Sequence, residues 1–389
     1  MPLRLGGVKF HIDDTDLGTC VSCGLCLPHC PTFRVTGEEG LSPRGRITAI
    51  RAVHIDDAPV TPEFVSFMET CVQCRGCEPA CPSGVPYGRL QEGVRETLAE
   101  QHRITPRWQR VGFAVLPKHR LLLAGSSLVA IAQRLHLVPK RFGLPKLALR
   151  RPPGLQPTGT DVWLFTGCVM DAWLRETHHN TAKVLSHLGI SYSLPGTGGG
   201  CCGALHTHAG LTDNARSLAV DVMASMPGNA PIVVNSAGCG AALKEYGHLL
   251  GTPQAAEFAA RVRDVHEVVA EHMDRLHPVR RIGSVIIQDP CHLRHVQRSH
   301  QSVRTVLSAV ADLVELDDDG LCCGAGGAYS ALQPELAASI RERKLASLAR
   351  AGATADGGVV ASANPGCAMH LAAVGLTVRH PIDLLAEAL

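Results

Sequence analysis

Aromatic side chains, net charge and long apolar segments are all scarce in this 389-residue sequence. Aromatic residues make up 4% of the chain and the formal net charge is +2. Few side chains could therefore stack on bases, and no overall positive field would attract a nucleic acid. No apolar run reaches the roughly 20 residues of a membrane-spanning helix, and the N-terminus lacks the apolar core of a signal peptide. We expect a cytoplasmic protein that binds no nucleic acid.

Acidic residues are absent from one long segment, residues 101–152, which contains eleven Lys or Arg. Its apolar stretch, residues 121–133, is too short to cross a bilayer. We expect a basic helical connector that docks on anionic lipid at the inner face of the cytoplasmic membrane, or on an acidic partner subunit. The alternative is a connector whose charges are simply solvated.

Cysteine, by contrast, is abundant, with sixteen in the chain. Cytosolic thiols stay reduced, so grouped cysteines indicate metal ligands rather than disulfides. Eight lie between Cys20 and Cys81, none in residues 82–167, and eight between Cys168 and Cys367. This distribution predicts two cysteine-bearing regions joined by the basic segment.

The first region contains the same cysteine pattern twice, in "CVSCGLCLPHCP" (residues 20–31) and "CVQCRGCEPACP" (residues 71–82). Both have the C-x2-C-x2-C-x3-C-P spacing of two-cluster bacterial ferredoxins, in which the fourth cysteine of each run binds the other cluster. Structural zinc, the alternative, normally uses paired C-x2-C knuckles. Helical patterns between the runs, at residues 42–54 and 61–70, favour a helical ferredoxin module. We predict one [4Fe-4S] cluster on Cys20, Cys23, Cys26 and Cys81, and a second on Cys71, Cys74, Cys77 and Cys30.

The second region reads as strands alternating with helices, and the pattern occurs twice. Each copy has a cysteine after a buried strand, an adjacent cysteine pair in a glycine-containing turn, and a cysteine after another strand. Such duplication predicts two similar α/β units with parallel strands, whose ligands lie at the carboxyl ends of the strands. The cysteines are Cys168, Cys201, Cys202 and Cys239 in the first copy, and Cys291, Cys322, Cys323 and Cys367 in the second.

Together these patterns predict a multi-domain α+β protein. A helical ferredoxin-type domain, residues 1–100, precedes the basic helical connector, residues 101–158. The first cysteine-rich domain then covers residues 159–280, and the second covers residues 281–389. In the second copy we expect Asp289 to cap a helix that starts near Cys291.

The stretches "GGGCCGALHTHAG" (residues 198–210) and "LCCGAGGAYS" (residues 321–330) resemble the cysteine-rich CCG domain family. The resemblance implies that the four cysteines of each copy bind an iron-sulfur cluster. It also shows a departure, because Ser236 and Asn364 replace the first cysteine of the family's C-x2-C. Heterodisulfide reductases use the full five-cysteine set, so disulfide-cleaving chemistry is disfavoured here. His206 is the neighbour that could complete a site short of one cysteine; hydrogen bonding around the ligands, or simple packing, is the alternative.

In finer detail, "DPCHLRHVQ", "SANPGCAMHLA" and the order of the domains are most similar to the iron-sulfur subunit of glycolate oxidase. This resemblance implies an electron-transfer subunit with no catalytic residues for substrate, which works with FAD-containing 2-hydroxyacid oxidase subunits acting on glycolate or D-lactate. It also implies transfer toward the quinone pool, and one or two further [4Fe-4S] clusters in the CCG domains. The alternatives are a thiol-disulfide reductase of the heterodisulfide reductase type, or the iron-sulfur subunit of a lactate-utilisation system or glycerol-3-phosphate dehydrogenase. A scaffold or zinc-bound interaction protein is a further alternative.

Overall fold

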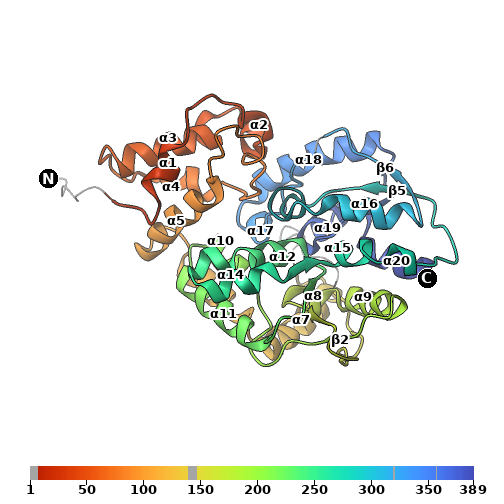
Figure 1. Cartoon of the computed structure of the whole chain (residues 1–389). Coiled ribbons are helices and arrows are strands. Elements are labelled where there is room, and N and C mark those ends of the chain that lie inside the picture. Colours follow the sequence, from red (N-terminus) through yellow and green to blue (C-terminus); the bar gives the residue numbers. More distant parts are fainter. Residues whose placement is uncertain (1–7, 139–146, 319, 356) are drawn as a thin grey trace.

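The computed structural model describes residues 8–138, 147–318, 320–355 and 357–389. A helical N-terminal region, drawn in red and orange in Figure 1, lies beside two α/β copies drawn in green and blue. Two helices that follow the N-terminal region in the chain lead into the first copy. The observed arrangement is therefore helical at its start and α/β with parallel strands afterwards, as the sequence predicts.

Short helices with clear N-terminal signals build the N-terminal region. Ser42 accepts a hydrogen bond from the Gly45 backbone N–H at the start of α3, and Thr61 caps α4 in the same way, each followed by proline at the first helical position. Their apolar faces meet in one buried core, to which Ile50 of α3 belongs. The helices are α1 (Asp14–Gly18), α2 (Pro31–Thr36), α3 (Pro43–His54), α4 (Pro62–Glu69) and α5 (Tyr87–Glu100).

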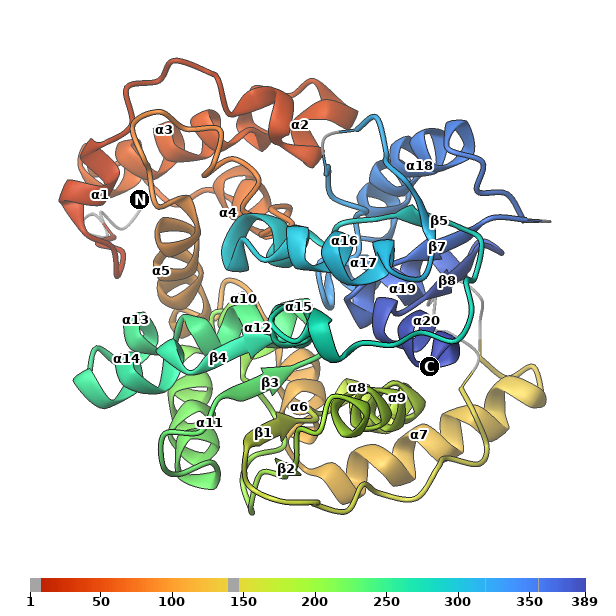
Figure 2. The ribbon, with the colours of Figure 1, turned by 45° about the vertical axis from the view of Figure 1, so that its right-hand side comes forward.

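The basic segment contains two described helices, α6 (Arg107–Val115) and α7 (His119–Arg134). The two are bent by 106° relative to each other. Figure 2 shows α7 running along the outside of the first copy, beside α8. No single described helix is both long and apolar enough to cross a bilayer, and only this bent pair passes that test when its two helices are joined.

Each α/β copy contains a four-stranded parallel sheet with the same strand order. In the first copy the order is β2-β1-β3-β4, and in the second it is β6-β5-β7-β8. The first sheet consists of β1 (Val162–Phe165), β2 (Tyr192–Ser193), β3 (Ile232–Val234) and β4 (Val262–Asp264). The second consists of β5 (Ser284–Ile287), β6 (Asp312–Val314), β7 (Val359–Ala361) and β8 (Thr377–Arg379). The predicted duplication is thus present at the level of sheet topology.

Helices cover both sheets. After α9 (Arg175–His187), the chain turns at Gly189 with φ 73°, the left-handed conformation expected of a glycine that ends a helix. The others in the first copy are α8 (Val169–Trp173), α10 (Ala204–His208), α11 (Thr212–Ser225), α12 (Ala237–Lys244), α13 (Tyr246–Leu250), α14 (Pro253–Ala260) and α15 (Val265–Ala270). The second copy has a π-helix, His292–Gln297, with α16 (His300–Ser308), α17 (Tyr329–Leu332), α18 (Pro334–Arg350), α19 (Pro365–Ala372) and α20 (Pro381–Ala388).

The two copies share one hydrophobic core. Leu164 of β1 and Ile287 of β5 belong to the same cluster of buried side chains, together with Leu185 of α9 and Leu385 of α20. Each such buried aliphatic side chain contributes about 1.5–3 kcal/mol to folding. Polar contacts reinforce the seam, because Asp383 of α20 accepts a hydrogen bond from Thr177 of α9 at 3.0 Å. The two copies therefore pack against each other through a shared core.

Candidate metal-cluster sites

The first predicted ferredoxin set lines a single small cavity. Cys20, Cys23, Cys26 and Cys81 all lie in its wall, and Cys77 lies there too. The loop that carries three of them has positive φ at Ser22 (58°) and Gly24 (85°), on either side of Cys23. Left-handed residues alternating with residues of negative φ turn successive backbone N–H groups toward one side, which is a recurrent cradle for iron-sulfur clusters.

The second set lines an adjoining cavity with the same backbone geometry. Its wall includes Cys30, Cys71, Cys74 and Cys77. Gln73 and Arg75, which flank Cys74, both have φ 58°, matching the positions of Ser22 and Gly24 in the other loop. Since neither is a glycine, this strained conformation is held by the surroundings. The two loops thus form equivalent cradles.

Polar groups converge on the sulfurs of this second cavity. The Tyr87 hydroxyl donates to the Cys71 sulfur at 3.6 Å, and the buried Arg46 guanidinium lies 4.0 Å from the Cys30 sulfur. Burial raises the pKa of Cys77, and the nearby Cys74 and Cys71 raise it further. Buried thiols so close together cannot all ionise unless a cation compensates them, so this site fits a positively charged iron core.

In the first α/β copy the four predicted cysteines meet beyond the carboxyl ends of β1 and β3. Cys168 follows β1 and lies within hydrogen-bond distance of Cys201, while Cys202 has the same relation to Cys239 on α12. Gly203, directly after the pair, has φ 78°, which provides the turn that starts α10. From β1 the chain continues to β2 on one side of the sheet, and from β3 it continues to β4 on the other side. The site lies at this change of direction, which is where open parallel sheets bind ligands.

The second copy repeats the arrangement at β5 and β7. Cys322 lies within hydrogen-bond distance of Cys291 and Cys323, and Cys323 has the same relation to Cys367. The Gly324 backbone N–H donates to the Cys322 sulfur at 3.4 Å. None of the sixteen cysteines forms a disulfide. Within the described part of the chain, no three Cys, His, Asp or Glu side chains are arranged to bind a single metal ion. The sulfurs instead line cavities, or lie within hydrogen-bond distance of one or more neighbouring sulfurs.

The second ferredoxin cavity touches the second copy directly. Cys74 lies within hydrogen-bond distance of Cys322, and both belong to one buried cluster with Val72 and Tyr329. The Tyr329 hydroxyl donates to the Thr70 carbonyl oxygen at 3.1 Å, which fixes the two regions against each other. This junction joins residues about 250 positions apart, and no local pattern in the sequence indicates it.

The first copy meets the ferredoxin region through a different set of contacts. Arg95 and Gln73 both donate to the His208 carbonyl oxygen, at 2.6 and 3.1 Å. The rings of His208 and His292 stack with centroids 5.7 Å apart. Burial lowers the pKa of His208 to about 3 and that of His292 to about 4, so both rings are neutral at physiological pH.

His206 packs against the basic segment. Its ring centroid lies 6.0 Å from that of Phe113 on α6, and it hydrogen-bonds with the Phe113 backbone. Burial lowers its pKa. The observed contacts therefore agree with the packing alternative, and a ligand role for His206 remains a prediction that these contacts do not support.

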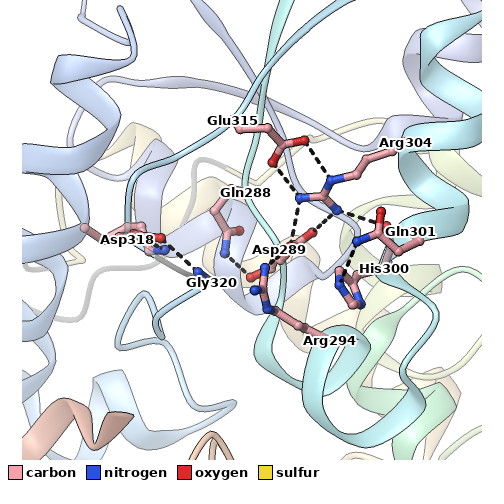
Figure 3. A network of polar contacts seen from close by, with 10 residues as sticks. Gln288, Asp289, Arg294, His300, Gln301, Arg304, Glu315, Asp318 and Gly320 are labelled. Atoms are coloured by element: carbon pink, nitrogen blue, oxygen red, sulfur yellow. Dashed lines mark hydrogen bonds and ion pairs between the residues drawn. The ribbon is translucent and has the colours of Figure 1, made fainter. Parts of the chain in front are cut away.

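Asp289 has a role other than the predicted helix cap. The residue at the start of the π-helix is Cys291, and no side chain caps it. Figure 3 shows the Asp289 carboxylate between Arg294 and Arg304, with oxygen–nitrogen distances of 3.0 Å to each. Arg304 also binds Glu315 at 2.7 Å. This network fixes the turn that carries Cys291, and the expectation of a cap is wrong because ion pairs occupy the carboxylate.

Comparison with known proteins agrees with these observations. A family model for a 4Fe-4S dicluster domain matches residues 16–85, and one for a cysteine-rich domain matches residues 162–244 and 285–372. The chain is 30% identical to the probable glycolate oxidase iron-sulfur subunit of Bacillus subtilis, over 98% of this chain and 96% of that protein. It is 31% identical to the glycolate oxidase iron-sulfur subunit of Escherichia coli, over 97% and 95%. A dihydromethanophenazine:CoB–CoM heterodisulfide reductase polypeptide of Methanosarcina barkeri is 27% identical, over 96% and 94%.

Proposed function

The chain belongs to the family of glycolate oxidase iron-sulfur subunits, and from this premise we propose that it accepts electrons from a separate FAD-containing subunit. It is an iron-sulfur electron-transfer subunit of an oxidoreductase. In our proposal the flavoprotein oxidises glycolate, or D-lactate, and the electrons leave this chain toward the quinone pool. A disulfide reductase of the heterodisulfide reductase type is the weaker alternative, because Ser236 and Asn364 stand in place of the fifth cysteine of each copy.

The observation that carries the proposal is the contiguity of the cysteine sites. Cys77 and Tyr87 line both ferredoxin cavities, and Cys74 of the second cavity touches Cys322 of the second copy. Three cysteine sites therefore adjoin one another without an intervening layer of protein. Such a row is suited to carrying electrons through the chain, and the ferredoxin region forms one end of it.

We propose that the four predicted cysteine sets each hold a [4Fe-4S] cluster, which would supply reversible one-electron carriage. The protein's own residues then set the reduction potential of each site. Hydrogen bonds from Tyr87 and charge from Arg46 favour added negative charge at Cys71 and Cys30, so they raise the reduction potential of that site. We retain, as part of this proposal, the division into residues 1–100, 101–158, 159–280 and 281–389.

The exposed face of α6 and α7 supports a peripheral position on the inner face of the cytoplasmic membrane. Large apolar side chains there are open to solvent, among them Trp108, Val111, Leu121, Leu128 and Leu135. Exposed cations accompany them, namely Arg103, Arg107, Lys118, Arg120 and Arg134. Exposed apolar and basic side chains on and beside two neighbouring helices suit binding to anionic lipid, to which each cation adds about 1 kcal/mol. Such a position would bring the chain near a quinone-linked acceptor.

Metal analysis of anaerobically purified protein tests the proposal. We expect about sixteen iron atoms per chain and four EPR signals that appear at stepwise potentials. Cys202→Ser should remove one signal and leave both ferredoxin signals, and Cys322→Ser should remove a different one. About eight iron atoms, or stoichiometric zinc, would contradict the sites in the α/β copies. Copurification of a flavoprotein under gentle lysis tests the partner separately.

A further inference from the structure

Asn364 occupies the position where the CCG pattern has a cysteine, and its side chain faces the other copy. It precedes α19, which carries Cys367, yet it does not cap that helix. The Gly238 backbone N–H of α12 donates to its Oδ1 at 3.0 Å. The adjacent Ala237 N–H donates to the Ala363 carbonyl oxygen, also at 3.0 Å. The second copy therefore provides acceptors to the first turn of a helix in the first copy.

These acceptors serve groups that otherwise lack partners. The first N–H groups of any helix have no acceptor within the helix itself. Helix α12 carries Cys239 directly after Gly238, so the contact with Asn364 fixes the backbone at that cysteine. Ser236, the residue before α12 and the counterpart of Asn364, makes no side-chain cap there.

The other end of the same amide faces a sulfur. Nδ2 of Asn364 donates to the Cys367 sulfur at 3.5 Å. The orientation of the amide follows from the network: the Gly238 N–H is a donor, so the atom facing it must be the oxygen, and the nitrogen is left for the sulfur. A cysteine at this position could replace neither contact well, because a thiol is a weak donor and a weak acceptor.

We propose that Asn364 is a positioning residue shared by the two cysteine-rich copies. Its oxygen holds the start of α12, and therefore Cys239, while its N–H stabilises negative charge on Cys367. Hydrogen bonds to cluster sulfurs raise the reduction potential, so the second copy has a higher potential than it would have without this amide. Asparagine in place of cysteine thus fixes the backbone beside Cys239 in the first copy and raises the reduction potential of the site in the second copy. The tuning part rests on the proposed cluster in the second copy.

Three variants of the full chain separate these roles. Asn364→Ala removes both contacts, Asn364→Asp keeps an oxygen for Gly238 but removes the donor to Cys367, and Ser236→Ala is the matched control in the first copy. The first measurement is an EPR-monitored redox titration of the signal that Cys367→Ser abolishes. The second is amide hydrogen exchange, read by mass spectrometry, in a peptide that contains Gly238.

We expect both Asn364 variants to lower the potential of that signal. Only Asn364→Ala should speed exchange at Gly238, on the order of fivefold, as the loss of one hydrogen bond predicts. Ser236→Ala should change neither. If the wild-type signal is present and neither readout moves in Asn364→Ala, the inference is wrong while the cluster proposal stands. If the wild-type second copy gives no signal, the cluster assignment and the tuning role both fail, and hydrogen exchange alone decides the capping role.

Discussion

Arg46 shows how one buried side chain supports a cysteine site from outside the motif. It is 1% exposed, and its guanidinium donates to the carbonyl oxygens of Phe67 at 2.6 Å and Leu41 at 2.7 Å. Burial by itself lowers its pKa, but Tyr87 and the nearby cysteines raise it above the ordinary value. The charge therefore stays beside Cys30, and it compensates the negative charge expected on the sulfurs.

Replacing this charge should affect both folding and redox behaviour. We expect Arg46→Gln to lower the free energy of unfolding by about 3 kcal/mol, because buried carbonyl groups lose charged donors. It should also lower the potential of one ferredoxin EPR signal. Arg216 is 45% exposed, and Arg216→Gln breaks its ion pairs with Glu96 and Asp213 and its 3.4 Å hydrogen bond to the Leu249 carbonyl oxygen. This change should cost less than about 1 kcal/mol. Equal denaturation midpoints for the two variants would contradict this account.

Residue spacing predicts the cysteine sets, but not the side chains that serve them. The C-x2-C-x2-C-x3-C-P runs indicate which thiols belong together because the pairing is encoded in local spacing. Arg46, Asn364 and the contact between Cys74 and Cys322 depend on how distant segments pack, and a single sequence contains no local signal for them. The expectation of a cap at Asp289 fails for the same reason, because its ion-pair partner Arg304 lies 15 residues further along the chain.

At the scale of elements, the sequence predicts the two central strands of each sheet and misses the two outer ones. Strands β1, β3, β5 and β7 end in continuous apolar runs just before the cysteines, so they can be recognised from the sequence. Strands β2, β4, β6 and β8 contain two or three residues each, and β6 and β8 have no fully buried side chain. Strands of two or three residues are too short for a period-two pattern to be read, and these four also lack the continuous apolar run that identifies β3 and β7.

The α6–α7 surface leads to a prediction about lipid binding. We expect the wild-type chain to cosediment with vesicles of anionic phospholipid, more weakly as salt rises, and not with purely zwitterionic vesicles. Leu128→Glu should reduce this binding, since Leu128 is 68% exposed on α7. Val220→Glu, at a 55% exposed site on α11, is the matched control and should bind as the wild type does. Binding that is indifferent to Leu128 but lost in the control would place the contact elsewhere.

At the scale of the whole molecule, neutral histidines line the seam between the two α/β copies. Asn235, at the end of β3, bonds the His178 ring at 2.9 Å through its amide nitrogen and the His380 ring at 3.0 Å through its backbone carbonyl oxygen. Burial lowers the pKa of His178 to about 4 and that of His380 well below its ordinary value. Protonating either ring would place a charge in the buried seam between the copies.

Stability should therefore fall as the solution is acidified. Below about pH 6.5 these histidines are protonated in the unfolded chain but stay neutral in the folded protein. Each of them therefore lowers the free energy of unfolding by about 1.4 kcal/mol for each pH unit of acidification. For His178 this loss continues down to about pH 4, where the folded protein also binds the proton. We expect His178→Gln to reduce the slope of the unfolding temperature between pH 6.5 and 4.5. The exposed His277→Gln should leave it unchanged. Parallel curves for wild type and His178→Gln would refute this role.

Helix α20 also constrains how the protein is made. Helix α20 leaves the ribosome after every other described element, yet its Leu385 belongs to the same core as Leu185 of α9 in the first copy. A nascent chain consequently exposes the apolar face of α9 until translation has passed α20. We expect iron delivery to Cys168 and its partners to follow synthesis of α20. The ferredoxin loops, whose core lies within residues 10–104, can be loaded earlier, while synthesis continues.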